Sequence, residues 1–383
     1  MRIALVSDTY TPQVNGVTTV VERIARVLRE CGHAVVVVAP RYPNDASPPP
    51  DELRIPSAAF PPYPSIRLSV PQFGTVSRYL DAFEPQVVHV ATEGPLGLTG
   101  RRYATQRRIP LVTSYHTNFP QYARHYGAGL AEPLVWRWLR WFHRPAVLTQ
   151  TPGEAVRDEL VRRGIGNPVV WGRGVDTKHF HPVRRSPGWR RWLAGGDDSA
   201  IVLHVGRLAA EKNIDVLAEA WSAARERVGQ RATFVLAGEG PEARGLLGRL
   251  PWVRQLGFLE RDRLAEVYAS SDICVLPSKT ETCGLVALEA MASGLAVIAA
   301  DAGGFRESIA HGLTGMLVAP DDATGFAAGI LSLVINPYRR RELAAGARTA
   351  ALARDVAPEN VTLLQQYAGA AGLPSAGATP CAA

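Results

Sequence analysis

The chain has 383 residues, of which 46% are hydrophobic and 20% charged, a composition typical of a globular protein long enough for two domains. No apolar run approaches the ~20 residues of a membrane-spanning helix, and the start has no long apolar signal segment. We therefore exclude an integral membrane protein and expect a cytoplasmic one. The four cysteines form no CxxC pair and have no metal-ligand spacing. No metal cluster or DxD-like pair stands in a suitable place either, so we expect no obligatory metal.

The net charge of +7 lies entirely in the first half of the chain. Residues 1–180 hold 21 Lys and Arg against 14 Asp and Glu, whereas residues 181–383 hold 21 of each. One interpretation is an acidic partner for the first half, either an anionic membrane surface or a phosphorylated acceptor. Peripheral binding at the inner face of the plasma membrane would fit the first of these. The other interpretation is arginine used only for solubility. We expect no nucleic-acid partner.

Short apolar runs alternate with helix-like segments in two successive series. Such runs predict buried parallel strands, and two series predict two doubly wound α/β domains. The expected strands are 2–7, 34–39, 86–90, 110–115, 146–150 and 168–171 in the first series, and 201–206, 232–238, 252–257, 273–277 and 295–300 in the second.

The expected domain break follows "GVDTKHFHP" (174–182), where a stretch rich in Gly, Pro and charge begins. This gives an N-terminal domain of 1–182 and a C-terminal domain of 183–355. We expect the last helix, about 356–371, to pack back on the N-terminal domain, and 372–383 to be a disordered tail. The segment 40–64, with nine prolines, is expected to be a long loop.

Two carboxylates flank the start of a helix in "SKTETCGLVALEAMASG" (278–294). Glu281 stands just ahead of the expected helix and Glu289 about one turn inside it, with Gly284 at the mouth. A helix N-terminus offers backbone N–H groups and partial positive charge to a phosphate, while carboxylates accept hydrogen bonds from sugar and ribose hydroxyls. The alternative is that Glu281 caps the helix and Glu289 faces solvent.

Two cations follow the first strand of the second series, in "HVGRLAAEKNID" (204–215). Arg207 comes directly after the strand and Lys212 five residues later. A pair of cations there can bind a diphosphate and stabilise the negative charge that grows on it as a leaving group. A solvated surface of Arg, Glu and Lys is the alternative.

The first domain has two weaker candidates. Asn15 and Gly16 open the helix after the first strand, where glycine would let the backbone approach a ligand, although a plain turn would also need it. His116 follows the strand 110–115, where an imidazole could reach a ligand or serve only packing.

Together these motifs resemble the retaining glycosyltransferases of family four, over nearly the whole chain. The resemblance rests on "PQVNGV", "GVDTKHFHP", "GRLAAEKN", "AGEGPE" and, most specifically, the E-x7-E signature within 281–309. It implies the GT-B fold, an α/β architecture of two Rossmann-like doubly wound domains facing across a cleft. "TSYHTNFPQYARHYG" and "WGRGVDTKHFHP" look most similar to bacterial GDP-mannose-dependent α-mannosyltransferases of glycolipid synthesis.

The resemblance also implies roles for residues of the C-terminal domain. Glu281 would hold the 3- and 4-hydroxyls of the donor sugar, helped by the backbone amides of Gly284 and Leu285. Glu289 would bind the ribose hydroxyls. Cys283 departs from the family, where many relatives carry Phe, and the smaller side chain would loosen packing around Gly284.

Other implied roles concern the diphosphate and the acceptor. Arg207 and Lys212 would bind the diphosphate, and Gly16 would approach it from the other domain. His116 would lie by the donor sugar and the acceptor hydroxyl. The catalytic set is then His116, Arg207, Lys212 and Glu281.

The expected activity is transfer of a sugar, with mannose from GDP-mannose favoured, to a lipid-linked or glycan hydroxyl with retention. The alternative is a UDP-sugar-dependent glycolipid synthase, such as one that transfers sulfoquinovose or glucose to diacylglycerol. No cofactor is expected, because cationic side chains would replace a metal. A catalytically silent sugar-nucleotide sensor is a less favoured alternative, since the complete residue set is present.

Two further segments allow more than one interpretation. "GEGPEA" (238–243) formally fits the G-x-G-x-x-A dinucleotide fingerprint, but alone it is weak evidence for an NAD-dependent enzyme. "PLVWRWLRWFHR" (133–144) would form a helix with arginines largely on one side and, on the other, Val135, Trp138, Leu139 and Phe142. That helix could lie in a membrane interface or, as we favour, pack its aromatic residues into the domain core.

Overall fold

The structure is a computed structural model that describes residues 1–13, 15–43, 48–60, 63–116, 132–172, 174–194 and 199–374, with only the backbone described at 60 and 63–66. The chain divides into two units, which we describe separately. Unit 1 comprises Met1–Arg173 and Glu359–Ala383, and unit 2 comprises Gly174–Pro358. These divisions fall at 173/174 and 358/359, against the expected 182/183 and 355/356. The expected disordered tail lies mostly outside the described residues.

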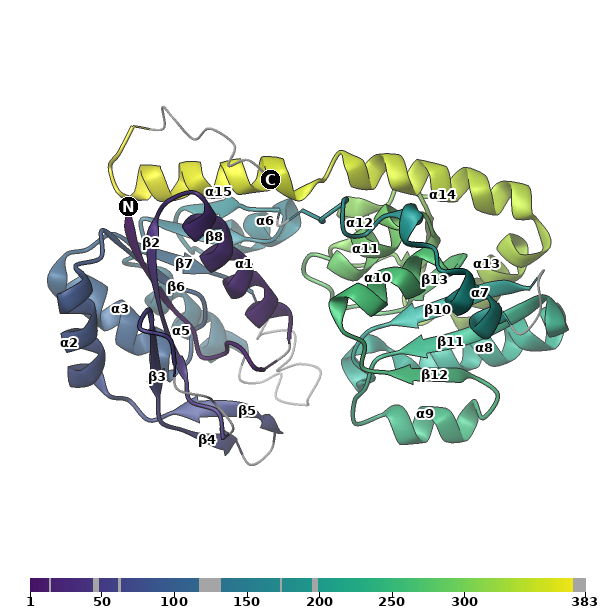
Figure 1. Cartoon of the computed structure of the whole chain (residues 1–383), viewed down its shortest axis with the longest axis horizontal. Coiled ribbons are helices and arrows are strands. Elements are labelled where there is room, and N and C mark those ends of the chain that lie inside the picture. The colour runs from purple at the N-terminus through teal and green to yellow at the C-terminus, as the bar shows by residue number, and fades with distance from the viewer. Residues whose placement is uncertain are drawn as a thin grey trace. The chain divides into compact units, whose positions relative to one another are not determined.

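Unit 1 is built on a seven-stranded parallel sheet with the order β3-β2-β1-β6-β7-β8-β9 (Figure 1). Its inner strands are rich in β-branched residues and buried on both faces, as is typical of parallel strands. The strands are β1 (Arg2–Val6), β2 (Ala34–Pro40), β3 (Glu52–Ile55), β6 (Val87–Val90), β7 (Leu111–Ser114), β8 (Leu148–Thr151) and β9 (Pro168–Val170), beside an antiparallel pair of β4 (Ser57–Phe60) and β5 (Tyr63–Ser69).

Helices cover both faces of this sheet. The helices α1 and α15 share one hydrophobic core with the sheet, and α2, α3 and α5 contribute to the core on the other face. The helices of unit 1 are α1 (Gly16–Glu30), α2 (Phe73–Phe83), α3 (Pro95–Arg107), α5 (Glu132–His143), α6 (Glu154–Arg162) and α15 (Val356–Ala370), the last of which begins in unit 2.

The C-terminal helix α15 is bound to unit 1 by specific polar contacts as well as by packing. Tyr367 is fully buried and its hydroxyl lies 2.5 Å from Nδ1 of His89, a residue of the central strand β6. The indole N–H of Trp171 donates to the Glu359 carbonyl at 3.0 Å. The helix α15 therefore completes the core of the first unit.

The proline-rich segment 40–64 is not simply the long loop expected from its composition. It contains β3, which pairs with β2 at the edge of the sheet, and β4, which pairs with β5. Each of these strands has only four paired residues, which lie in short runs between the prolines. Such runs are too short to show a clear hydrophobic period, so the sequence did not indicate them as strands.

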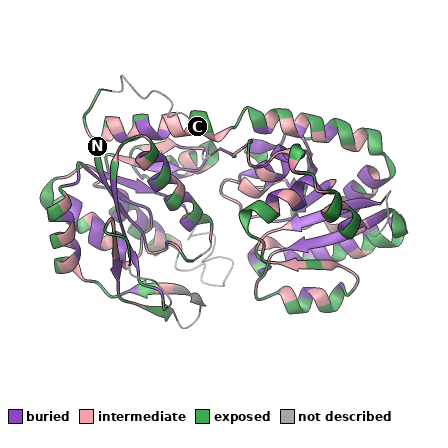
Figure 2. Ribbon diagram, in the orientation of Figure 1, coloured by how far each residue is buried: buried purple, intermediate pink, exposed green. Residues whose placement is uncertain are grey.

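Unit 2 repeats the design with a six-stranded parallel sheet, order β12-β11-β10-β13-β14-β15. Figure 2 shows its central strands buried and the outer faces of its helices exposed. The strands are β10 (Ala200–Val205), β11 (Ala232–Ala237), β12 (Arg254–Gly257), β13 (Ile273–Leu276), β14 (Ala296–Ala300) and β15 (Met316–Val318). The short strand β15 was missed in the sequence.

The helices of unit 2 also lie on both faces of the sheet. One core contains residues of α8, α9 and α13, and the other contains residues of α7, α10 and α11. The helices are α7 (Pro187–Ala194), α8 (Ile214–Val228), α9 (Ala243–Arg249), α10 (Arg261–Ala269), α11 (Leu285–Ala292), α12 (Phe305–Ser308), α13 (Ala323–Ile335) and α14 (Pro337–Leu352). In the part of the chain described above, no helix combines the length and apolar character needed to span a bilayer.

Candidate active site

The polar residues singled out in unit 2 follow two neighbouring strands, β10 and β13. The chain runs from β10 to β11 on one side and later returns to β13 on the other, so the sheet reverses its winding between β10 and β13. Open α/β sheets bind ligands at such a switch point, beyond the carboxyl ends of the strands. Arg207 and Lys212 follow β10 and Glu281 follows β13, which places the candidate residues around this point.

Lys212 and Glu281 form a direct ion pair, with Nζ of the lysine donating to Oε1 of the glutamate. Lys212 ends a short 3-10 helix, η3 (Ala210–Lys212), and its side chain is 25% exposed, while that of Glu281 is 15% exposed. Each charge therefore neutralises the other at the edge of the sheet. A diphosphate that binds the ammonium and hydroxyls that donate to the carboxylate could replace this pairing without leaving either charge bare.

Hydrogen bonds hold together the two loops that carry this ion pair. The hydroxyls of Ser278 and Thr280, on the loop after β13, donate to the Glu211 carbonyl at 3.4 and 3.1 Å. The side-chain amide of Asn213 donates to the Pro277 carbonyl at 3.3 Å. Because the contacts lie on both sides of Lys212, its position relative to Glu281 is set by the backbone as well as by charge.

The mouth of α11 requires the glycine that stands there. Gly284 caps the helix in the left-handed region, with φ of 67°. A Cβ on it would lie 2.9 Å from Cδ1 of Phe305, closer than real Cβ atoms approach a neighbour. Leu285 is then the first helical residue, so the amides of Gly284 and Leu285 belong to the N-terminus of α11. The aromatic ring beside Gly284 therefore belongs to Phe305, while the residue before Gly284 is the small Cys283.

A second glycine-rich turn supports the Glu281 loop from behind. The Gly304 amide donates to the Glu281 carbonyl at 2.8 Å, and a Cβ on Gly303 would lie 2.3 Å from that same oxygen. Gly303 has φ of 52°. These glycines allow a close backbone contact that fixes the position of the Glu281 backbone.

Glu289 lies in the second turn of α11, and it does not face open solvent. The hydroxyl of Tyr268, on α10, donates to its Oε2 at 3.3 Å. Burial of the carboxyl group raises the pKa of Glu289 to about 7, an effect that Arg261 and the Tyr268 hydrogen bond only partly offset. A partly exposed acid whose carboxyl group has a pKa in this range is a candidate for ligand binding.

Arg207 is exposed at the carboxyl edge of the sheet, on a loop that the "GEGPEA" segment supports. A Cβ on Gly238 would lie 1.9 Å from the Gly206 carbonyl oxygen, and one on Gly240 would lie 2.2 Å from that of Leu208. The two glycines of the apparent dinucleotide fingerprint are thus needed to pack against the Arg207 loop. This structural role accounts for the motif without NAD.

Unit 1 carries the two remaining candidates. Asn15 caps α1, because its side-chain oxygen accepts from the amides of Val17 and Thr18 at 3.0 and 2.9 Å. Gly16, the first residue of α1, is exposed, and apart from its chain neighbours and its own helix backbone no atom of the described residues lies within 4 Å of the place of a Cβ. His116 lies two residues beyond β7 and is 8% exposed.

The switch point of unit 1 contains a partly buried acid that the sequence reading missed. Asp8 follows β1 and accepts from the amides of Leu96 and Gly97 at 2.8 and 3.2 Å, at the N-terminus of α3. A Cβ on Gly94 would lie 2.6 Å from this carboxyl group. Burial raises the pKa of Asp8 despite these hydrogen bonds. The carboxylate of Asp8 therefore caps the N-terminus of α3. In the sequence, its only signal was "SD" (7–8) directly after a strand.

The arginine- and tryptophan-rich helix α5 has both a buried and an exposed aromatic face. Trp136, Leu139 and Phe142 are buried, at 3%, 0% and 0% exposure. Trp138 and Trp141, however, are 39% and 46% exposed. The expectation that Trp138 packs inward was wrong, because one turn of helix cannot bury Trp136 and Trp138 on the same side.

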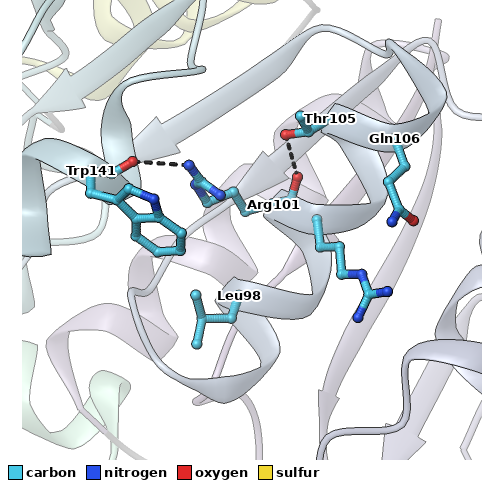
Figure 3. Close-up of a pocket in the computed structure, with 6 residues that line it drawn as sticks. Leu98, Arg101, Thr105, Gln106 and Trp141 are labelled. Carbon is cyan, nitrogen blue, oxygen red and sulfur yellow. Dashed lines mark hydrogen bonds between the residues drawn. The ribbon is translucent and has the colours of Figure 1, made fainter.

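The exposed face of α5 adjoins α3 in a shallow pocket of about 300 Å³ lined by residues of both helices. Arg101 donates to the Trp141 carbonyl at 3.0 Å, and its guanidinium lies 3.9 Å from the centre of the Trp141 ring (Figure 3). Arg102, Arg137, Arg140 and Arg144 are exposed on the same two helices or directly after them. We call these residues, with Trp138 and Trp141, the basic-aromatic surface.

Unit 2 therefore brings together six candidates around one sheet edge, namely Arg207, Lys212, Glu281, Gly284, Leu285 and Glu289. Gly16 and His116 belong to unit 1. The sequence reading missed Tyr268, which holds Glu289, and the hydroxyls of Ser278 and Thr280. For Ser278 and Thr280 the only signal was the cluster of hydroxyl residues in "SKTET" (278–282).

The raised pKa of Glu289 predicts a pH-dependent affinity. If the ionised carboxylate accepts ribose hydroxyls, lowering the pH from 8 to 6 protonates it and should weaken GDP binding roughly tenfold. Calorimetry would measure this. Glu289→Gln should remove the part of the dependence that Glu289 causes and leave the part caused by titration of the terminal phosphate of GDP. Equal pH profiles in the two proteins would contradict the assignment.

The chain matches known families in both halves. Residues 14–179 match the family described as Glycosyltransferase Family 4, and residues 199–336 match glycosyl transferases group 1. A GDP-mannose-dependent alpha-mannosyltransferase of Mycolicibacterium smegmatis is 37% identical over 92% of this chain and 93% of that protein. Sulfoquinovosyl transferase SQD2 of Arabidopsis thaliana is 32% identical over 91% of this chain and 69% of that protein.

The fold agrees with these matches. Sucrose-phosphate synthase from Thermosynechococcus elongatus superimposes with a TM-score of 0.76 at 22% identity, covering 96% of this chain and 98% of that chain. The expected GT-B architecture of two Rossmann-like domains is confirmed. The chain belongs to the family-four glycosyltransferases.

Proposed function

We propose that the protein transfers mannose from GDP-mannose to a hydroxyl of a lipid-linked or glycan acceptor, with retention of the α-configuration. The observation that carries the proposal is the Lys212–Glu281 pair at the switch point, where a cation and an acceptor of hydroxyl hydrogen bonds lie together beside a helix mouth. The 37% identity to a GDP-mannose-dependent alpha-mannosyltransferase supports mannose as the sugar.

In the proposed reaction, the bond between the anomeric carbon and the leaving phosphate oxygen breaks. The acceptor oxygen bonds to that carbon on the same face, and its proton passes to the leaving phosphate. Arg207, Lys212 and the amides at the mouth of α11 stabilise the charge that grows on the diphosphate. A double displacement would need a carboxylate on the opposite face, and Glu281 is already assigned to hydroxyls.

The other proposed roles follow from the chemistry of each group. Glu281 accepts hydrogen bonds from the 3- and 4-hydroxyls of the sugar, and the Gly284 and Leu285 amides assist. Glu289 accepts from the ribose hydroxyls. From unit 1, Gly16 approaches the diphosphate and His116 lies by the sugar and the acceptor. Because cationic side chains neutralise the diphosphate, the reaction needs no metal.

A UDP-sugar donor is the second candidate, supported by the 32% identity to a sulfoquinovosyl transferase. The diphosphate, sugar and ribose groups are common to both donors, so the residues above serve either. A silent sugar-nucleotide sensor would bind the donor without transfer.

A donor screen tests the proposal. Hydrolysis and transfer would be compared for GDP-mannose, UDP-glucose, UDP-galactose and UDP-sulfoquinovose, with EDTA in the buffer. We expect GDP-mannose to react fastest and to give an α-linked product by NMR. Preference for a UDP-sugar would favour the second candidate. A β-linked product, or a requirement for a divalent metal, would contradict the mechanism.

Lys212→Ala separates an enzyme from a sensor. Because charge on the diphosphate grows in the transition state, we expect kcat to fall about a hundredfold or more, exceeding the change in donor Kd. Lys212→Arg should recover only part of the loss. Lys279→Ala is the matched control, since Lys279 pairs with Asp321 at 2.9 Å at the surface. Normal kcat with weakened binding in Lys212→Ala would rule out its catalytic role.

We further propose that the basic-aromatic surface binds an anionic membrane. Exposed tryptophans with neighbouring arginines suit the interface between headgroups and acyl chains. All of the excess positive charge lies in residues 1–180, which include this surface. An acceptor in a lipid layer would then be reached from a cytoplasmic protein bound peripherally.

Vesicle binding tests this surface. The protein should bind phosphatidylglycerol vesicles more strongly than phosphatidylcholine vesicles, and high salt should release it. The double variant Trp138→Ser/Trp141→Ser should bind several-fold more weakly. Trp192→Ser is the control, because Trp192 is 50% exposed but lies on α7 of unit 2. Equal losses in the two variants, or equal binding to both lipids, would refute the assignment.

A further inference from the structure

A buried histidine, His204, occupies the switch point of unit 2, near the end of β10. The strands β10 and β13 pair in register at Val202 with Ile273 and at Leu203 with Cys274, and no further. At the next position, Nδ1 of His204 lies 2.8 Å from the Val275 carbonyl. The imidazole therefore bridges the two strands where their backbone pairing ends.

The other ring nitrogen of His204 has no hydrogen-bond partner among the described residues, although the side chain is only 2% exposed. Nε2 lies 3.7 Å from the place of a Cβ on Gly206, the residue directly before Arg207. The amide of Gly206 is not available to it, since that amide donates to the Ala237 carbonyl at 3.0 Å. A buried polar atom without a partner is unfavourable and calls for a ligand or a moving side chain.

The hydrogen bond to Val275 settles which nitrogen carries the proton. A carbonyl only accepts, so Nδ1 is protonated and Nε2 offers a lone pair. Burial lowers the pKa of His204 to about 4, so the ring is neutral at physiological pH. Lys212 adds to this shift and Glu281 opposes it, so both members of the ion pair lie within electrostatic reach of the ring.

Of these two charged groups, only one can donate to Nε2. The Glu281 carboxylate is an acceptor, whereas the Lys212 ammonium carries three N–H groups, one of which is directed to Glu281. A diphosphate that binds one of these N–H groups in place of Glu281 moves the ammonium, and another N–H can then point to Nε2.

We propose that His204 is a positioning residue of the donor site, whose Nε2 accepts a hydrogen bond from the Lys212 ammonium when a nucleotide-sugar diphosphate is bound. The inference rests on the proposed donor site and adds a residue that acts through Lys212. It explains why a histidine, and not an aliphatic residue, stands near the end of this otherwise apolar strand.

Paired substitutions separate the two ring nitrogens. His204→Asn keeps a donor where Nδ1 stands and removes Nε2, so it should keep the melting temperature close to wild type yet lower kcat about tenfold with a smaller change in KM. His204→Gln places an amide near Nε2 and should recover part of kcat. His204→Phe loses both groups and should be destabilised as well. Wild-type kcat in folded His204→Asn would overturn the proposal.

A double-mutant cycle tests whether His204 acts through Lys212. In the Lys212→Ala background, His204→Asn should change kcat by less than about twofold, because the interaction is already absent. A loss of the same size in both backgrounds would show an independent role and overturn the inference.

A measurement on the unsubstituted histidine avoids any folding defect. With ¹⁵N-labelled histidine, the Nε2 resonance of His204 should move toward lower frequency when GDP is added, or UDP if the donor screen selects a uridine donor. Lys212→Ala should abolish the movement. Nucleotide binding with an unmoved Nε2 resonance would overturn the inference while leaving the proposed function intact. Absence of any nucleotide binding would instead contradict both the proposed function and this inference.

Discussion

The ion pair between Lys212 and Glu281 is the constraint around which unit 2 is arranged. It joins the loop after β10 to the loop after β13, on either side of the point where the sheet reverses its winding. The hydroxyls of Ser278 and Thr280 and the turn at Gly303 hold those loops in place. A site built in this way is ready for a ligand that is anionic at one end and rich in hydroxyls at the other. A nucleotide sugar has both.

Much of this arrangement could be predicted from the sequence, because its signals are local. Each of these signals can be recognised within a few residues of sequence. They are the apolar runs of the buried strands, the glycine at the N-terminus of α11 and the cations after β10. The edge strands β3 and β15 were not, since they are three or four residues long and their burial comes from neighbours distant in the chain. Trp138 was assigned to the inward face of α5 wrongly for a related reason, although Leu139 and Phe142 of that face are buried. Periodicity shows that a helix has faces, and only packing decides which tryptophan is covered.

The residues that the sequence reading missed share one property, which is that they act on another residue. Tyr268 donates to Glu289 across twenty residues of chain, and Nδ1 of His204, on β10, donates to the Val275 carbonyl on the neighbouring strand β13. No spacing rule connects such partners. They become visible only when the sheet order places β10 beside β13 and the burial of each polar atom can be compared with its hydrogen bonds.

The central claim is that donor binding exchanges the Lys212–Glu281 pair for contacts with the donor. A crystal structure of the complex with GDP-mannose, or with the donor that the screen selects, measures this directly. The account predicts Nζ of Lys212 at about 3 Å from a diphosphate oxygen and the Glu281 carboxylate at the same distance from sugar hydroxyls. A bound donor with the ion pair intact and its diphosphate away from Lys212 would contradict the account.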